Sequence, residues 1–191
     1  MSRQTTARVV GRRAAAVALA SGIVALTLIV VAPTAFAATK AKLGQTKENY
    51  LCSSSDQWIQ TATSGPSYVV PAGDNKLAKW STNGGADAGT MQLEVWAPAG
   101  GNDYTLVYIS AETVLQAGKV TKVALKPAVK VVAGDVIGYR AVSEADCALN
   151  TGNSDDAYVY DPESGAPTVG STVDFQGPAT GFEFNIAAVA H

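Results

Sequence analysis

The fold is decided by the stretch Val129-Lys130-Val131-Val132-Ala133-Gly134-Asp135-Val136-Ile137-Gly138-Tyr139-Arg140-Ala141-Val142. The β-branched and aromatic residues on either side of its centre are typical of strands. At the centre, Gly134 can adopt a positive φ without steric cost, and Asp135 can accept hydrogen bonds from nearby amides, which predicts a turn. Every other apolar segment after residue 49 is also short and bounded by turn residues. The stretch therefore predicts an all-β fold.

Alternation of apolar and polar residues predicts how the strands face. In Thr90–Val95 and again in Phe182–Ile186, every second residue is apolar, which is the period expected for a strand with one buried face. Glu94 and Glu183 fall on the polar side and are expected to be exposed. With about eight strands and a turn roughly every ten residues, the pattern predicts an antiparallel β-sandwich of jelly-roll-like form.

The N-terminal segment is typical of an export signal. Four arginines come first, residues 14–32 are uncharged, and Ala35-Phe36-Ala37 forms an A-x-A cleavage site. We expect residues 1–37 to be a signal peptide, 38–49 a flexible leader, and 50–191 the β-sandwich domain. The apolar run approaches the ~20 residues that span a bilayer, so an uncleaved anchor is the alternative, and the Arg12-Arg13 pair leaves open Sec or twin-arginine export. In either case the domain is predicted to be extracellular.

The net charge limits which partners the protein is expected to bind. Removing the four arginines of the signal leaves 10 basic and 16 acidic residues, so the net charge changes from −2 to −6. An acidic surface argues against nucleic acid as a partner, because phosphate binding needs clustered Lys and Arg. It argues against anionic membranes for the same reason.

Both cysteines, Cys52 and Cys147, lie in the part expected to be exported. An even pair in an oxidising compartment usually forms a disulfide, with two free thiols as the alternative. We predict a bridge between the start of the domain and the segment that follows the Gly134-Asp135 turn.

Several segments resemble those of a known group of proteins. They are Tyr68–Gly73, Thr90–Trp96, Val131–Gly138 and Phe184–Ala188. Together they resemble small secreted β-sandwich proteins of actinobacterial type, most of which have no assigned function. The resemblance covers most of the mature domain. It implies a fold and no catalytic residues, because its motifs are structural.

Few residues suit catalysis. The only histidine is His191, the final residue, where a side chain is usually too mobile to act as a catalytic base. Two cysteines and one histidine supply too few ligands to close a zinc site. No phosphate-binding glycine loop or dinucleotide fingerprint is present. We therefore expect a protein that is not an enzyme. A carboxylate-dependent glycoside hydrolase, using a pair such as Glu94 and Glu183, is the remaining catalytic alternative.

Calcium is the candidate cofactor. Asn153, Asp155, Asp156 and Asp161 concentrate oxygen ligands in one loop region, and calcium binds six to eight such oxygens. The same residue types also form turns, and turn formation is the more frequent role.

Aromatic residues support a binding hypothesis. Trp96 is in phase with Glu94 and is expected on the polar face, where a ring could stack on a sugar, unless a bulge turns it inward. Tyr158 and Tyr160 share one face of a short strand beside the acidic loop. The sequence thus predicts a secreted, non-catalytic module that binds extracellular carbohydrate or cell-wall polymer. The alternative is a structural or protein-interaction component of the cell surface.

Overall fold

The computed structural model describes residues 40–73, 75–162 and 165–191, and these form strands and loops without a helix. No part of these ranges makes a helix long and apolar enough to cross a membrane. The predicted signal peptide lies outside the described residues. The strands are β1 (Ala41–Gln45), β2 (Tyr50–Cys52), β3 (Gln57–Gln60), β4 (Asn75–Asn83), β5 (Thr90–Gly100), β6 (Asp103–Ile109), β7 (Thr113–Val114), β8 (Val120–Val131), β9 (Val136–Ala141), β10 (Ala145–Asn150), β11 (Ala157–Asp161), β12 (Thr172–Asp174), β13 (Gln176–Thr180), β14 (Phe182–Phe184) and β15 (Ile186–Ala190).

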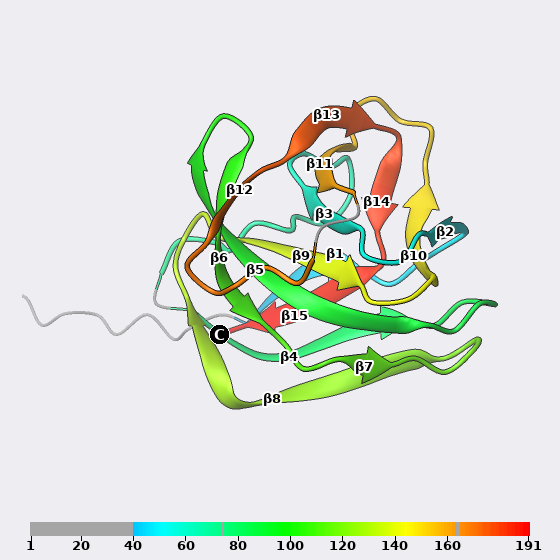
Figure 1. Cartoon of the computed structure of the whole chain (residues 1–191). Coiled ribbons are helices and arrows are strands. Elements are labelled where there is room, and N and C mark those ends of the chain that lie inside the picture. The colour runs from blue at the N-terminus through cyan, green and yellow to red at the C-terminus, as the bar shows by residue number, and fades with distance from the viewer. Residues whose placement is uncertain (1–39, 74, 163–164) are drawn as a thin grey trace, which may run out of the picture. The chain divides into compact units, whose positions relative to one another are not determined.

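The strands form three antiparallel sheets, as Figure 1 shows. One sheet has the order β1-β15-β4-β8, and a small one has the order β14-β10-β2. The largest has the order β12-β6-β5-β9-β3-β11-β13, with β7 added to β5. The predicted all-β, sandwich-like fold is confirmed. The strands are more numerous than expected because short segments at bends pair separately.

The largest sheet curls into a nearly closed ring. Its two edge strands, β12 and β13, are consecutive in the chain and are separated by Phe175 alone. Two edges joined by one residue must lie close together, so the sheet bends round until they nearly meet. The ring consequently has an interior of its own, distinct from the core that it shares with the other two sheets.

The deciding stretch, 129–142, links two sheets. The turn is as predicted: Gly134 has φ 93°, and the Val132 amide donates to Oδ2 of Asp135 at 2.9 Å. The flanking strands, however, do not pair with each other. β8 belongs to the four-stranded sheet and β9 to the ring, so the turn passes the chain from one layer to the other.

The expectation of a flexible leader over residues 38–49 is wrong for its described part. β1 pairs with β15 along its whole length, and Leu43 is buried. Lys40 and Lys42 alternate with Ala41 and Leu43, so this edge strand points its lysines outward and its apolar side chain into the core.

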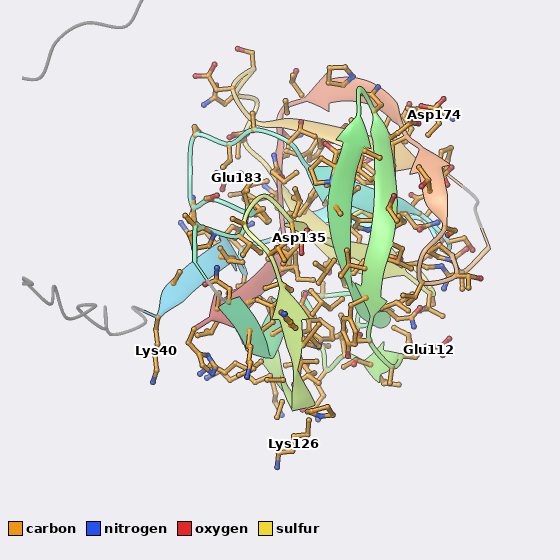
Figure 2. All side chains as sticks on the ribbon, turned by 90° about the vertical axis from the view of Figure 1, so that its left-hand side faces the viewer. Lys40, Glu112, Lys126, Asp135, Asp174 and Glu183 are labelled. Carbon is orange, nitrogen blue, oxygen red and sulfur yellow. A yellow bond between two sulfur atoms is a disulfide. The ribbon has the colours of Figure 1, made fainter. Side chains whose placement is uncertain are left out.

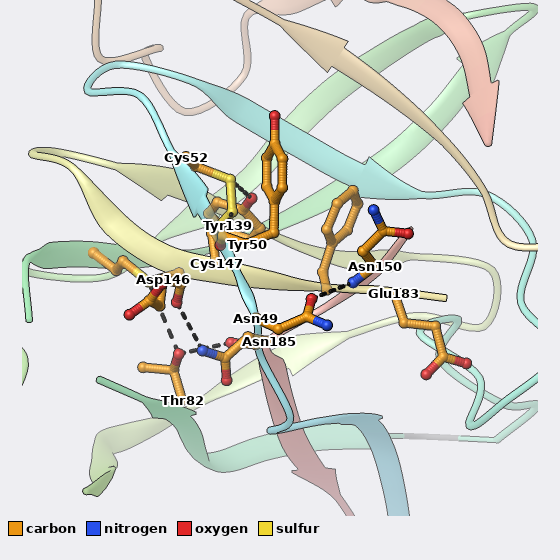
Figure 3. The surroundings of a disulfide bond; sticks show 12 residues. Asn49, Tyr50, Cys52, Thr82, Tyr139, Asp146, Cys147, Asn150, Glu183 and Asn185 are labelled. Atoms are coloured by element: carbon orange, nitrogen blue, oxygen red, sulfur yellow. Dashed lines mark hydrogen bonds between the residues drawn. A yellow bond between two sulfur atoms is a disulfide. The ribbon is translucent and has the colours of Figure 1, made fainter. Parts of the chain in front are cut away.

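The prediction that the polar residues of 182–186 are exposed is also wrong. Asn185 is fully buried between β14 and β15, where the chain passes from one sheet to another. Its side chain accepts the Asn83 amide at 2.8 Å and donates to the Asn83 carbonyl at 2.7 Å. It also donates to the Asp146 carbonyl at 2.8 Å (Figure 3). Glu183 is buried as well and accepts a hydrogen bond from Thr63 Oγ1 at 3.0 Å. Buried polar side chains satisfied in this way join the sheets rather than face water.

The predicted disulfide between Cys52 and Cys147 is confirmed. It ties β2 to β10 within the small sheet, and both residues are buried. Figure 3 shows the Tyr139 hydroxyl beside the bridge, 3.0 Å from the Sγ of Cys52. Because Tyr139 belongs to β9, the bridge also lies against the ring.

Candidate functional site

A groove of about 520 Å³ opens between the end of β6 and the middle of β8. One wall runs from Tyr108 to Thr113, and the other is formed by residues 123–129 of β8. The volume lies in the range of small-molecule sites, which are typically 300–1,000 Å³ in extent. We refer to this feature as the β6–β8 groove.

The β8 wall arises from an interruption of the strand pairing. Leu77 of β4 pairs with Val129 and Lys79 with Ala124, so residues 125–128 oppose Ala78 alone. Pro127 lies in this bulge and has no amide hydrogen to donate to a ladder, which explains why pairing fails there. The unpaired residues 125–128 all line this side of the groove.

A second bulge places the aromatic residue of the groove. Trp96 pairs with Leu106 and Val95 with Tyr108, so Val107 is an extra residue in β6. Directly opposed residues share a face. The extra residue therefore moves Tyr108 from the face of Trp96 to the face of Val95, which is turned toward the other sheets.

The groove offers both apolar and hydrogen-bonding groups. Val123 and Leu125 provide aliphatic surface, and Tyr108 adds a phenol whose pKa is raised above its ordinary value by partial burial. Ser110 Oγ accepts the Leu93 amide at 2.9 Å and donates to the Ala111 carbonyl, so it is engaged within the protein. A ring bound in the groove would contact the Tyr108 ring and could bond to its hydroxyl. The lining residues, all within the described ranges, include no carboxylate.

Trp96 is not an exposed platform, so that prediction is wrong. It does lie on the face of Glu94, as its phase indicated, but its exposed fraction is 0%. Because the sheet curls into a ring, this face lines the ring interior. There Phe175 packs edge-on against Trp96 with the ring centroids 5.1 Å apart.

The same interior holds a row of polar residues. Asp161 opposes Gln57, Gln57 opposes Arg140, and Arg140 opposes Gln92, across four neighbouring strands. Arg140 donates from Nη1 to Oε1 of Gln92 at 3.3 Å. Neither amide atom of the buried Gln57 has a hydrogen-bond partner among the described residues.

Glu94 lies beside this row and is fully buried, contrary to the expectation of exposure. Its Oε2 accepts the Trp96 indole N–H at 3.0 Å, whereas Oε1 has no described partner. Burial raises the pKa of Glu94 to about 8, although the Trp96 hydrogen bond and the charge of Arg140 lower it. The negative charge of Asp161 adds to the increase. Glu94 is thus a largely neutral acid below pH 8. It lies in a different sheet from Glu183.

Tyr158 and Tyr160, the other two aromatic binding candidates, belong to a cluster of aromatic rings. Tyr158 is buried and stacks on Trp58 with the centroids 4.9 Å apart. Tyr160 is half-buried, 5.8 Å from the same indole. Phe184 packs edge-on against both Trp58 and Tyr158. The packing assigns Tyr158 to the core, and Tyr160 alone keeps some exposed surface.

The four calcium candidates take different structural roles. Asp156 is fully buried and accepts hydrogen bonds from the amide and hydroxyl of Ser64 and from the Thr151 hydroxyl. Burial raises the pKa of Asp156, but these bonds outweigh it and leave the pKa below its ordinary value. Asn153 accepts the Asp155 amide at 3.0 Å, which forms a turn, and Asp161 belongs to the polar row of the ring. Within the described ranges, no group of three or more His, Cys, Asp or Glu side chains is placed to hold a metal. Calcium binding stays a prediction.

Comparisons with known proteins add no further guide. The chain matches no family model, no curated protein and no solved structure. The resemblance to small secreted β-sandwich proteins therefore stays a prediction.

Sequence reasoning missed Tyr108 and the β6–β8 groove. One indication was present, since a proline within a strand pattern marks an edge or a bulge, and Pro127 lies in such a pattern. Nothing in the local sequence, however, marked Val107 as the extra residue.

Proposed function

We propose that the protein is a secreted, non-catalytic module that binds extracellular carbohydrate or cell-wall polymer in the β6–β8 groove. The observation that carries the proposal is the groove itself, where Tyr108 forms part of one wall and Val123 and Leu125 supply aliphatic surface on the other. Sugars expose both C–H faces and hydroxyls, and a tyrosine offers a ring face to the first and a phenol hydroxyl to the second. A lining without carboxylates favours binding over glycoside hydrolysis, which uses two of them.

Two observations support secretion. The basic, apolar and small-residue order of residues 1–37 is that of a signal peptide. The Cys52–Cys147 bridge is of the kind that persists in oxidising compartments.

Tyr108→Ala tests the groove. An aromatic contact of this kind contributes about 0.5–1.5 kcal/mol, so loss of the ring should weaken binding about three- to tenfold. Ligands would be found on a glycan array and by pull-down on insoluble chitin, cellulose and peptidoglycan, and affinities compared by calorimetry. Tyr50→Ala is the matched control, because Tyr50 is 40% exposed and does not line the groove. Equal affinity of Tyr108→Ala and the unmodified protein for a bound glycan would reject the groove as the site.

A protein-interaction role is the second proposal, favoured by one observation on β2. This strand is an edge of the small sheet, and its Tyr50 and Leu51 are 40% and 43% exposed. An apolar edge strand with unpaired backbone groups can add a strand from a partner. Analytical ultracentrifugation would show self-association that Leu51→Lys abolishes, whereas a strict monomer would remove the self-associating form of this proposal.

A further inference from the structure

Lysines are concentrated on one sheet of the protein. The strands β1, β15, β4 and β8 together contain six lysines and no aspartate or glutamate. All six side chains are exposed, on a chain whose overall net charge is negative. These lysines, which we call the lysine face, are Lys42, Lys76, Lys79, Lys122, Lys126 and Lys130. In Figure 2, Lys40 and Lys126 lie toward the end of the molecule that holds this sheet, and Asp174 lies at the opposite end.

Like charges lie close together on the lysine face. Lys76 and Lys130 are directly opposed on neighbouring strands, an arrangement of like charges that destabilises a sheet. None of the six side chains forms an ion pair or hydrogen bond with another described residue. A bound anion would relieve the repulsion.

A recess of about 310 Å³ lies within this face. Lys42, Lys79 and Lys122 stand around it, and its floor is made by small aliphatic residues such as Ala187 and Val189. The hydroxyl residues Thr46 and Ser81 also line it. The recess therefore combines cations, hydroxyls and a smooth apolar floor.

The register gives the spacing of these cations. Lys42 and Lys79 both pair with Val189 from opposite sides, so they lie two strands apart, at roughly 10 Å. Lys122 pairs with Ser81, which makes it a diagonal neighbour of Lys79 at roughly 8 Å. Anions that recur every ~8–10 Å along a chain would meet one lysine after another.

We propose that the lysine face binds a linear anionic glycan, a polysaccharide with regularly spaced carboxylate groups. The hydroxyls and the apolar floor suit sugar rings, and the lysines suit the carboxylates. Single-stranded nucleic acid fits less well, because the exposed side chains of this face include no aromatic ring on which bases could stack. A membrane surface is flat and would not enter the recess. Lys126 of the lysine face also lines the β6–β8 groove, but the recess shares no lining residue with that groove and the proposal does not depend on it.

The test compares polygalacturonate with neutral dextran, using the protein without residues 1–37. Polygalacturonate should bind and dextran should not, and binding should weaken as salt rises, because the contacts are screened. The triple variant Lys42→Gln/Lys79→Gln/Lys122→Gln should bind about tenfold more weakly or worse, with a smaller salt dependence. The matched control is Lys40→Gln/Lys47→Gln/Lys119→Gln, which removes the same charge from residues that do not line the recess and should retain affinity. Thermal unfolding of both variants confirms that they are folded.

Three results would overturn the proposal. One is equal loss of affinity in the two triple variants, which would indicate a diffuse charge effect. Another is tighter binding of single-stranded DNA or of phosphatidylserine vesicles than of polygalacturonate. The third is salt-sensitive dimerisation that the recess variant abolishes, which would make a second copy of the chain the occupant. Tyr108→Ala should leave polygalacturonate binding at this face unchanged, so failure here is distinguishable from failure of the groove.

Discussion

Glu94→Gln is expected to stabilise the protein at alkaline pH and to flatten the dependence of its stability on pH. The carboxyl is fully buried in the ring interior, and its pKa is raised from an ordinary value of 4.5 to about 8, chiefly by burial. Folding therefore favours the protonated acid. Glutamine is a neutral replacement of the same shape whose oxygen can still accept the Trp96 indole N–H.

The direction follows from proton linkage. Between the two pKa values the folded state holds a proton on Glu94 that the unfolded state has released, so stability falls as pH rises. The contribution is complete below about pH 4.5 and is lost by the time pH passes the folded value of about 8. A shift of this size corresponds to roughly 4–5 kcal/mol in total.

Urea unfolding between pH 5 and 9 measures the effect. The unmodified protein should lose stability over this range, and Glu94→Gln should lose much less, so the two curves separate with rising pH. Glu144→Gln is the control, because Glu144 is an exposed carboxyl that should leave the curve unchanged. Parallel curves for Glu94→Gln and the unmodified protein would show that Glu94 titrates normally.

Removal of the disulfide should have an effect of similar size. The bridge joins Cys52 to Cys147 across a separation of 95 residues, and closing a loop of that length restricts the unfolded chain by about 4–5 kcal/mol in the entropy model. The double variant Cys52→Ala/Cys147→Ala is expected to lose about 2–5 kcal/mol of unfolding free energy.

Two measurements check this expectation. Urea unfolding of the double variant gives the loss of stability directly, and a loss below about 1 kcal/mol would contradict a stabilising role. Reduction gives an independent view, because both cysteines are no more than 1% exposed. Dithiothreitol should act slowly on the folded protein and quickly in urea. Fast reduction of the native protein would show that β2 opens readily.

The sequence predicted the strands well, but it did not predict which parts of the protein pack against their faces. Alternation in Thr90–Val95 correctly placed Glu94 and Trp96 on one face. It could not show that this face lies inside a ring, because closure depends on β12 and β13, which are about eighty residues away along the chain. Asn185 was misjudged for a related reason, since its partners Asn83 and Asp146 come from other sheets. Glu94 was thus assigned to the correct phase but to the wrong environment, whereas Asn185 lies where the chain leaves one sheet for another.

The candidate site was less predictable than the fold. Trp96 and Tyr158 were chosen because aromatic rings often bind ligands, yet large rings are also the most effective core residues. Tyr108 reaches the groove through a single extra residue, Val107, and a shift of one residue exchanges the two faces of a strand. The cysteine pair was predictable because an even number of cysteines behind an expected export signal usually forms a disulfide, whatever surrounds them.

The four strands from 172 to 190 are joined by single residues, yet they complete every layer of the fold. β12 and β13 close the ring, β14 enters the small sheet, and β15 lies between β1 and β4. During synthesis, none of the three layers can be finished until this short stretch has emerged from the ribosome. Each layer therefore lacks at least one strand until residues 172–190 are available, which favours folding after synthesis over folding strand by strand during it.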